Sequence, residues 1–223
     1  MLINSPFRGL GGFPLSLCTA YMSDIPSNTD RLSAWWQLAL QGDTQAFEKM
    51  HVELFPGLYY YALKLLEDNE LADDAVQDLF IRIWVKRAAI GELQKVKAYF
   101  FTALRRQVLN QLRNLRLRQL NISRMLQPEI EFSPEEIVVK QEETENLHAR
   151  LLQLLNGLPP RQREAIYLHY FENMDYHQVA AVMGVNYQSV LNLTQKAMQK
   201  LRAANLLWVL LLLRGSQFIV HNS

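Results

Sequence analysis

The chain has 223 residues, of which 49% are apolar and 20% are charged, with a formal net charge of +1. This is the composition of a globular protein long enough for two small domains or one larger one, and no low-complexity tract appears in it. The single cysteine, Cys18, excludes an intramolecular disulfide framework and indicates a reducing compartment, so a cytoplasmic location is expected.

The first residues do not have the pattern of a secretory signal. The segment 9–22 is mildly apolar, but glycines and Pro14 interrupt it and Arg8 is the only basic residue before it. We therefore expect residues 1–28 to be an N-terminal extension, with Met22 as an alternative start of translation.

Nearly every patterned segment repeats its apolar residues with a period near 3.6, and no segment alternates as a strand does. Glycine, proline and polar clusters separate these segments. The fold class predicted is therefore all-α, with two small helical domains. Helices are expected at residues 29–41, 44–66, 70–87, 95–117, 134–155, 160–171, 176–183 and 187–213.

The helix expected at 70–87 has two distinct faces. One is a stripe for a core, formed by Ala72, Val76, Phe80 and Ile83. Asp74, Gln77 and Asp78, at positions i, i+3 and i+4, form a contiguous polar patch on another face. The patch is either a solvated surface or a surface that binds a partner.

The next helix, at 95–117, begins the most basic stretch of the chain. Residues 95–124 hold eight basic side chains and no acidic one, which is an electrostatic footprint for nucleic acid. The positions expected to be buried are Phe100, Ala103, Leu104, Val108 and Leu112. Arg106, Asn110, Arg113 and Asn114 fall on an exposed face, and arginine with asparagine suits phosphate contact and base reading.

Composition changes sharply after this helix. Residues 129–145 hold seven acidic side chains and one lysine. The domain boundaries that follow are a first helical domain at 29–118, an acidic linker at 119–143, a second helical domain at 144–204 and an apolar tail at 205–223. The apolar run at 206–213 is too short to span a bilayer.

Residues 175–202 read as two short helices joined by a tight turn. Asp175 and Gln178 have capping-box spacing, Gly184 supplies the turn, and Asn186 can cap the second helix. The exposed side of that second helix carries side chains that can read base edges in a major groove. They are Gln188, Ser189, Asn192, Gln195, Lys196 and Gln199. This is the arrangement of a helix-turn-helix.

Three motifs in order resemble the bacterial sigma-70 family. The family pattern D-x-x-Q-[DE]-x-F-x-x-x-W is matched by Asp74, Gln77, Asp78, Phe80 and Trp84. Residues 97–106 are similar to the region that opens and reads the downstream promoter element. Residues 158–164 (LPPRQRE) resemble the L-P-x-x-x-R-E opening of the fourth region. Two domains with a short linker resemble the extracytoplasmic-function (ECF) subgroup.

The resemblance implies a sigma region 2 bundle, a sigma region 4 helix-turn-helix and a non-catalytic function in transcription initiation at −10 and −35 promoter elements. It implies that Asp74, Gln77 and Asp78 dock on the β′ clamp of core RNA polymerase. It implies DNA contacts by Arg105 together with the exposed face of 95–117, and by the second helix of the helix-turn-helix. Further implied partners are the β flap and an anti-sigma factor, with no cofactor and no small-molecule substrate.

Two alternatives stay open from the residues themselves. A dimeric helix-turn-helix regulator would share residues 175–202 and would bind a palindromic operator. An enzyme is disfavoured because the sequence has no glycine-rich phosphate loop, no metal-ligand spacing and no nucleophile paired with a base.

Overall fold

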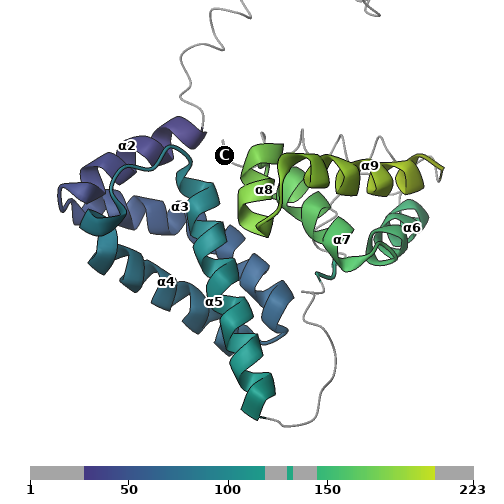
Figure 1. Cartoon of the computed structure of the whole chain (residues 1–223), viewed down its shortest axis with the longest axis horizontal. Helices are drawn as coiled ribbons and strands as arrows, with labels where there is room; N and C mark the ends of the chain where they lie inside the picture. The colour runs from purple at the N-terminus through teal and green to yellow at the C-terminus, as the bar shows by residue number, and fades with distance from the viewer. Residues whose placement is uncertain (1–27, 119–129, 133–144, 204–223) are drawn as a thin grey trace, which may run out of the picture.

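The computed structural model describes residues 28–118, 130–132 and 145–203. These residues form helices and short connections, and no strand occurs among them, so the all-α prediction is confirmed. Figure 1 shows two groups of helices side by side. The first group comprises α2 (Asn28–Leu40), α3 (Thr44–Leu66), α4 (Asn69–Ile90) and α5 (Val96–Arg118). The second comprises α6 (Glu145–Asn156), α7 (Pro160–Ile166), η3 (Tyr167–Phe171), α8 (Tyr176–Met183) and α9 (Tyr187–Ala203).

Acidic caps fix where α3 and α4 begin. The Asp43 carboxylate accepts hydrogen bonds from the backbone amides of Gln45 and Ala46 at 2.9 and 3.1 Å, which starts α3. Asp68 does the same for α4 through the amide of Leu71 at 2.9 Å. Each cap satisfies amides that have no partner within the helix and contributes about 1 kcal/mol.

A dense aromatic core holds these four helices together. Trp36, Tyr61, Phe100 and Phe101 are fully buried, and the rings of Trp36 and Phe100 meet edge to face with centroids 6.4 Å apart. The Trp36 indole donates a hydrogen bond to the carbonyl of Gly91 at 2.9 Å, which ties α2 to the connection between α4 and α5. Burial of each such side chain contributes about 1.5–3 kcal/mol, so α5 has a fixed position.

Local signals build the helix-turn-helix as the sequence predicts. Asp175 and Gln178 form a reciprocal capping box, with bonds of 2.8 and 2.9 Å, at the start of α8. Gly184 ends α8 with φ of 65°, a conformation that costs glycine little. Asn186 accepts a bond from the amide of Ser189 at 2.7 Å and starts α9. All three capping predictions are confirmed.

The structure departs from the predicted elements in two places, and two further predicted helices lie partly outside the described residues. Helix α4 continues to Ile90, so the connection before α5 is shorter than expected. The helix expected at 160–171 changes to a π-helical turn at Tyr167, where the amide of Glu172 bonds the carbonyl of Tyr167 at 3.1 Å. The helices expected at 134–155 and 187–213 are described only from Glu145 and up to Ala203.

Several expectations concern residues outside the described ranges, namely the N-terminal extension, most of the acidic linker and the apolar tail. Among the helices that the structure describes, none combines the length and the apolar character required to cross a bilayer.

Candidate functional site

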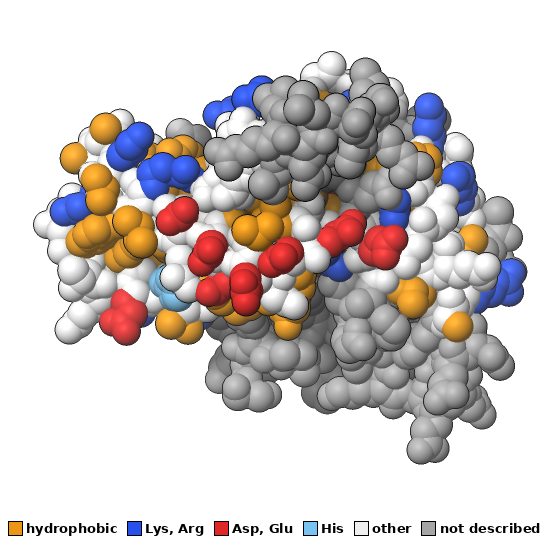
Figure 2. All heavy atoms as spheres, turned by 90° about the horizontal axis from the view of Figure 1, so that it is seen from below, with side chains coloured by type: hydrophobic (Ala, Val, Ile, Leu, Met, Phe, Trp, Pro, Cys, Tyr) orange, Lys and Arg blue, Asp and Glu red, His pale blue; other side chains and the backbone are white. Residues whose placement is uncertain are grey.

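The polar patch predicted on α4 is exposed. Asp74, Gln77 and Asp78 all face solvent, and the Gln77 amide donates to the Asp73 carboxylate at 2.6 Å. Figure 2, which looks at the molecule from below, shows acidic side chains gathered across this side of the protein with hydrophobic side chains beside them. An exposed acidic cluster next to apolar surface suits a partner that presents basic and apolar side chains together.

An apolar surface continues this patch along α4, and the sequence reasoning missed it. Ile81 and Val85 are 63% and 70% exposed, and they follow Asp74 and Asp78 at helical spacing. We call Asp74, Gln77, Asp78, Ile81 and Val85 the α4 face. Exposed isoleucine and valine at i+7 and i+11 from Asp74 are the signal that could have revealed this extension.

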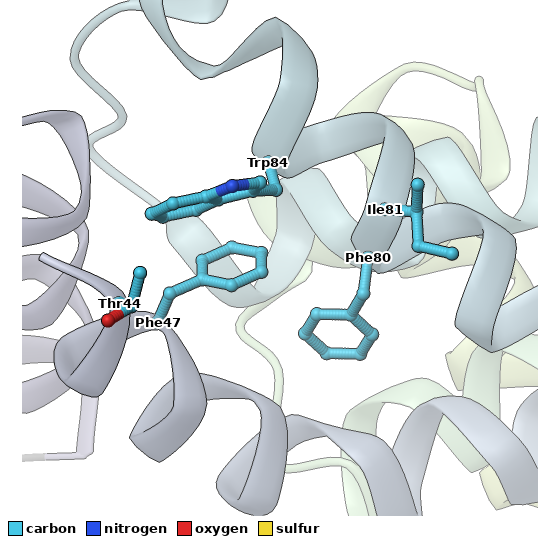
Figure 3. Close-up of a pocket in the computed structure, with 5 residues that line it drawn as sticks. All are labelled: Thr44, Phe47, Phe80, Ile81 and Trp84. Carbon is cyan, nitrogen blue, oxygen red and sulfur yellow. The ribbon is translucent and has the colours of Figure 1, made fainter. Parts of the chain in front are cut away.

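A pocket of about 270 Å³ lies beside the apolar half of the α4 face. Figure 3 shows the five side chains that line it, which are Thr44, Phe47, Phe80, Ile81 and Trp84. The Trp84 ring contacts the Phe47 ring, with centroids 4.9 Å apart, and the Arg87 guanidinium lies over the Trp84 ring, 4.0 Å from its centroid. Trp84 is half-buried and forms a wall of the pocket.

Helix α5 presents the exposed face that its sequence predicts. Arg106, Asn110, Arg113 and Asn114 are exposed, and the Arg113 guanidinium donates to the Asn110 side-chain oxygen at 3.1 Å. The opposite side is anchored in the core by Phe100, Leu104 and Val108, while Ala103 and Leu112 are half-buried. The outward side chains are a cationic and amide surface on a rigid support, which suits contact with phosphates and base edges.

Arg105 does not belong to that exposed face. Its side chain is only 13% exposed, and Nε and Nη2 donate to the two carboxylate oxygens of Glu164 at 2.7 and 3.2 Å. Burial acts to lower the Arg105 pKa, but the hydrogen bonds and negative charge of Glu164 raise it above its ordinary value. Arg105 therefore stays cationic. Its partner lies 59 residues away in sequence, so no local pattern could have identified the pair.

The outward side of α9 carries the predicted reading residues. Gln188, Asn192, Gln195 and Lys196 are exposed, and Ser189 is half-buried beside its cap. Tyr187, at the first position of α9, was missed: it is 40% exposed and its ring stacks on His177 of α8 at 4.4 Å. The N-terminal residues of a recognition helix contact base edges in helix-turn-helix proteins, and Tyr187 lies at that end of α9.

The fold defines a class of protein, an all-α protein of two helical domains whose second domain contains a helix-turn-helix. The family model for sigma-70 region 2 matches residues 51–118, and the model for sigma-70 region 4 matches residues 148–201. Together the two matches cover more than half of the chain. The chain belongs to the sigma-70 family, in its ECF subgroup.

Known proteins of this subgroup resemble the chain over most of its length. ECF RNA polymerase sigma factor SigM of Bacillus subtilis is 23% identical over 151 residues, covering 66% of this chain and 86% of SigM. ECF RNA polymerase sigma factor BldN of Streptomyces coelicolor is 26% identical over 179 residues, covering 78% of this chain and 66% of BldN. A crystal structure of the sigma factor RpoE with the anti-sigma factor NepR from Bartonella quintana has a TM-score of 0.53 at 24% identity, covering 72% and 96% of the two chains. That likeness supports the fold.

Proposed function

We propose that this chain is the subunit that gives RNA polymerase its promoter specificity, binding core polymerase through the α4 face and promoter DNA through α5 and α9. The observation that carries the proposal is the α4 face itself, where an exposed acidic patch and an exposed apolar strip follow one another on a single helix.

The chemistry of the α4 face fits the β′ clamp helices of polymerase that sigma factors contact. Asp74 and Asp78 would pair with basic side chains of the clamp, and Gln77 would accept or donate hydrogen bonds between them. Ile81 and Val85 would be covered, and the pocket at Phe47 and Trp84 has room for one apolar side chain of the partner.

The two DNA-reading surfaces lie on different domains, which suits two separate promoter elements. Helix α5 would contact the −10 element through Arg106, Asn110, Arg113 and Asn114, whereas Arg105, also expected among the DNA contacts, is paired with Glu164 in this structure. Helix α9 would read the −35 element from the major groove. Each contact alone is weak, but polymerase holds both domains, so the second contact becomes intramolecular and gains a high effective concentration.

Two further partners and a location follow from the same proposal. The second domain would contact the β flap of polymerase, and the chain would act in the cytoplasm, where polymerase is. RpoE of Bartonella quintana forms a complex with the anti-sigma factor NepR, and we expect an anti-sigma factor here to cover surfaces that polymerase otherwise uses.

The proposal is tested by charge reversal on the α4 face. Asp74→Lys with Asp78→Lys should abolish co-elution with core polymerase on gel filtration, because two attractive charges become repulsive. Asp78→Lys alone is compared with Glu92→Lys, which makes the same change in charge at another exposed site. Circular dichroism reports folding. Unchanged co-elution of a folded double variant would contradict the docking surface and favour a dimeric regulator.

A further inference from the structure

Two rows of side chains run along the outward side of α9. The polar row consists of Gln188, Asn192 and Gln195, which are all exposed, and the Gln188 amide donates to the Asn192 side-chain oxygen at 3.3 Å. The apolar row consists of Tyr187, which is 40% exposed, and Leu191, which is half-buried one helical turn further on. Helix α9 therefore offers amide groups and hydrocarbon side by side to a DNA groove.

A series of aromatic rings holds the apolar row in place. The Tyr187 ring stacks on His177 of α8, with centroids 4.4 Å apart and planes 26° from parallel. Tyr176 meets the Tyr187 ring at 6.3 Å and 79°, and Tyr176 stacks in turn on the buried His169 at 4.3 Å. His169 donates from Nδ1 to the carbonyl of Met174 at 2.7 Å, so the series of rings ends in the core of the second domain. Tyr187 is therefore exposed and yet held by its neighbours.

The charged side chains of α9 do not lie on the apolar row. Arginine and lysine are the side chains that most often read guanine, through O6 and N7. Residues 187–201 contain no arginine, and their lysines are Lys196 and Lys200. Lys196 follows Tyr187 by nine residues, which places it on the opposite side of the helix. Lysines at the edge of a recognition helix suit contact with phosphates.

The chemistry of the two rows fits adenine and thymine. Glutamine and asparagine make paired hydrogen bonds to N6 and N7 of adenine, and apolar side chains contact the methyl group of thymine. Because adenine and thymine pair with each other, a polar row and a neighbouring apolar row can read the two strands of the same base pairs.

We propose that α9 recognises an upstream element rich in A·T pairs, in which the polar row bonds adenine edges and the apolar row covers thymine methyl groups. Tyr187 is then a specificity-determining residue, and His177 is a positioning residue that acts through the Tyr187 ring. The base preference rests on the proposed function, because that function makes α9 the DNA-reading helix, but it requires no contact with polymerase.

The base preference is tested by selection from DNA duplexes that contain a randomised window. The full-length chain without polymerase is incubated with the duplexes at low salt, where phosphate contacts strengthen weak binding, and the bound duplexes are sequenced. Windows rich in A·T pairs should be enriched. Enrichment of G·C pairs, or no enrichment, would overturn the proposal. Transcription with polymerase is measured separately, so a failure of the proposed function and a failure of the base preference give different results.

The apolar row is tested with deoxyuridine, which pairs as thymidine does but lacks the methyl group. The wild type should bind a selected duplex about fourfold more weakly for each covered methyl group that is removed. Tyr187→Ser should lose most of this difference, whereas Tyr187→Phe should keep it, because the ring and not the hydroxyl covers the methyl group. The matched control is Tyr60→Ser, at a 54% exposed tyrosine of α3, and it should discriminate as the wild type does.

Equal binding of thymidine and deoxyuridine duplexes by the wild type would overturn the methyl contact, and this comparison needs no variant. A loss of discrimination in Tyr187→Phe as large as that in Tyr187→Ser would assign the contact to the hydroxyl and overturn it as well. His177→Ala should discriminate less than the wild type, and His177→Phe, which restores a flat ring, should recover the difference. A folded His177→Ala variant that discriminates as the wild type does would overturn the positioning role.

Discussion

Ile81→Ala is the sharpest test of the apolar half of the α4 face. The substitution removes three carbons, each contributing about 0.8 kcal/mol when buried, or roughly 2.4 kcal/mol in all. Because Ile81 is 63% exposed in the free protein, roughly 1.5 kcal/mol of this remains for a partner to gain. Alanine at this position should therefore weaken polymerase binding by about tenfold.

The same substitution should hardly change folding. The part of Ile81 that is already buried contributes roughly 0.9 kcal/mol, and the higher helix propensity of alanine offsets about 0.4 kcal/mol of that loss. We expect the free energy of unfolding to fall by about 0.5 kcal/mol, within the range of ordinary surface substitutions.

Biolayer interferometry with immobilised core polymerase measures the dissociation constant, and urea titration measures stability. Val52→Ala is the matched control, because Val52 is 69% exposed on α3 and does not belong to the α4 face. The control should bind as the wild type does. Dissociation constants for Ile81→Ala within twofold of the wild type would refute the extension of the docking surface beyond Asp78.

Two further predictions concern α9 and the buried tyrosine. Gln188→Ala or Gln195→Ala should cost about 1–3 kcal/mol of discrimination at the upstream promoter element; an equal loss of transcription on templates with that element scrambled would show that these side chains do not read it. Burial, and then the charge of Glu164, raise the pKa of Tyr61 well above its ordinary value. The folded chain therefore keeps a proton that the unfolded chain loses, so stability should be constant up to about pH 9 and should fall above about pH 10. In urea titrations at increasing pH, the free energy of unfolding of Tyr61→Phe should fall less above about pH 10 than that of the wild type. Identical profiles for the two proteins at alkaline pH would contradict the raised pKa of Tyr61.

Local chemistry explains which elements the sequence could predict. The predicted bounds 44–66 and 176–183 coincide with α3 and α8, because an aspartate before each helix caps it and glycine or a polar break ends it. Pro56 lies inside α3 without ending it, and the buried Leu54, Leu58 and Tyr61 hold the helix on both sides of that proline. Tertiary packing thus outweighs a local helix breaker.

The candidate surfaces could be predicted where they depend on helical period alone. Asp74, Asp78, Arg106 and Asn110 are exposed as their spacing indicates, and their roles in binding stay predictions. Contacts between side chains of two different helices could not be predicted from the sequence. The sequence placed Arg105 among the DNA contacts, but only the arrangement of α5 against α7 shows its pairing with Glu164.

The same limit applies to the pocket and to the linker. The pocket beside Trp84 forms where the start of α3 meets α4, and no spacing within either helix reveals it. Phe132, in the segment expected to be an acidic linker, is buried and exchanges hydrogen bonds of 2.8 and 3.1 Å with the Asn156 side chain. Composition indicated only an acidic linker there, and the packing of Phe132 against the rings of Tyr167 and Phe171 in the second domain could not be predicted from it.

Run-off transcription with bacterial core RNA polymerase tests the central claim most directly. The template is the DNA upstream of this protein's own gene, and the comparison is with core polymerase alone. We predict a discrete transcript that depends on the added chain and that Asp74→Lys with Asp78→Lys abolishes. A transcript pattern unchanged by the chain, together with no complex on gel filtration, would contradict its function as a sigma factor.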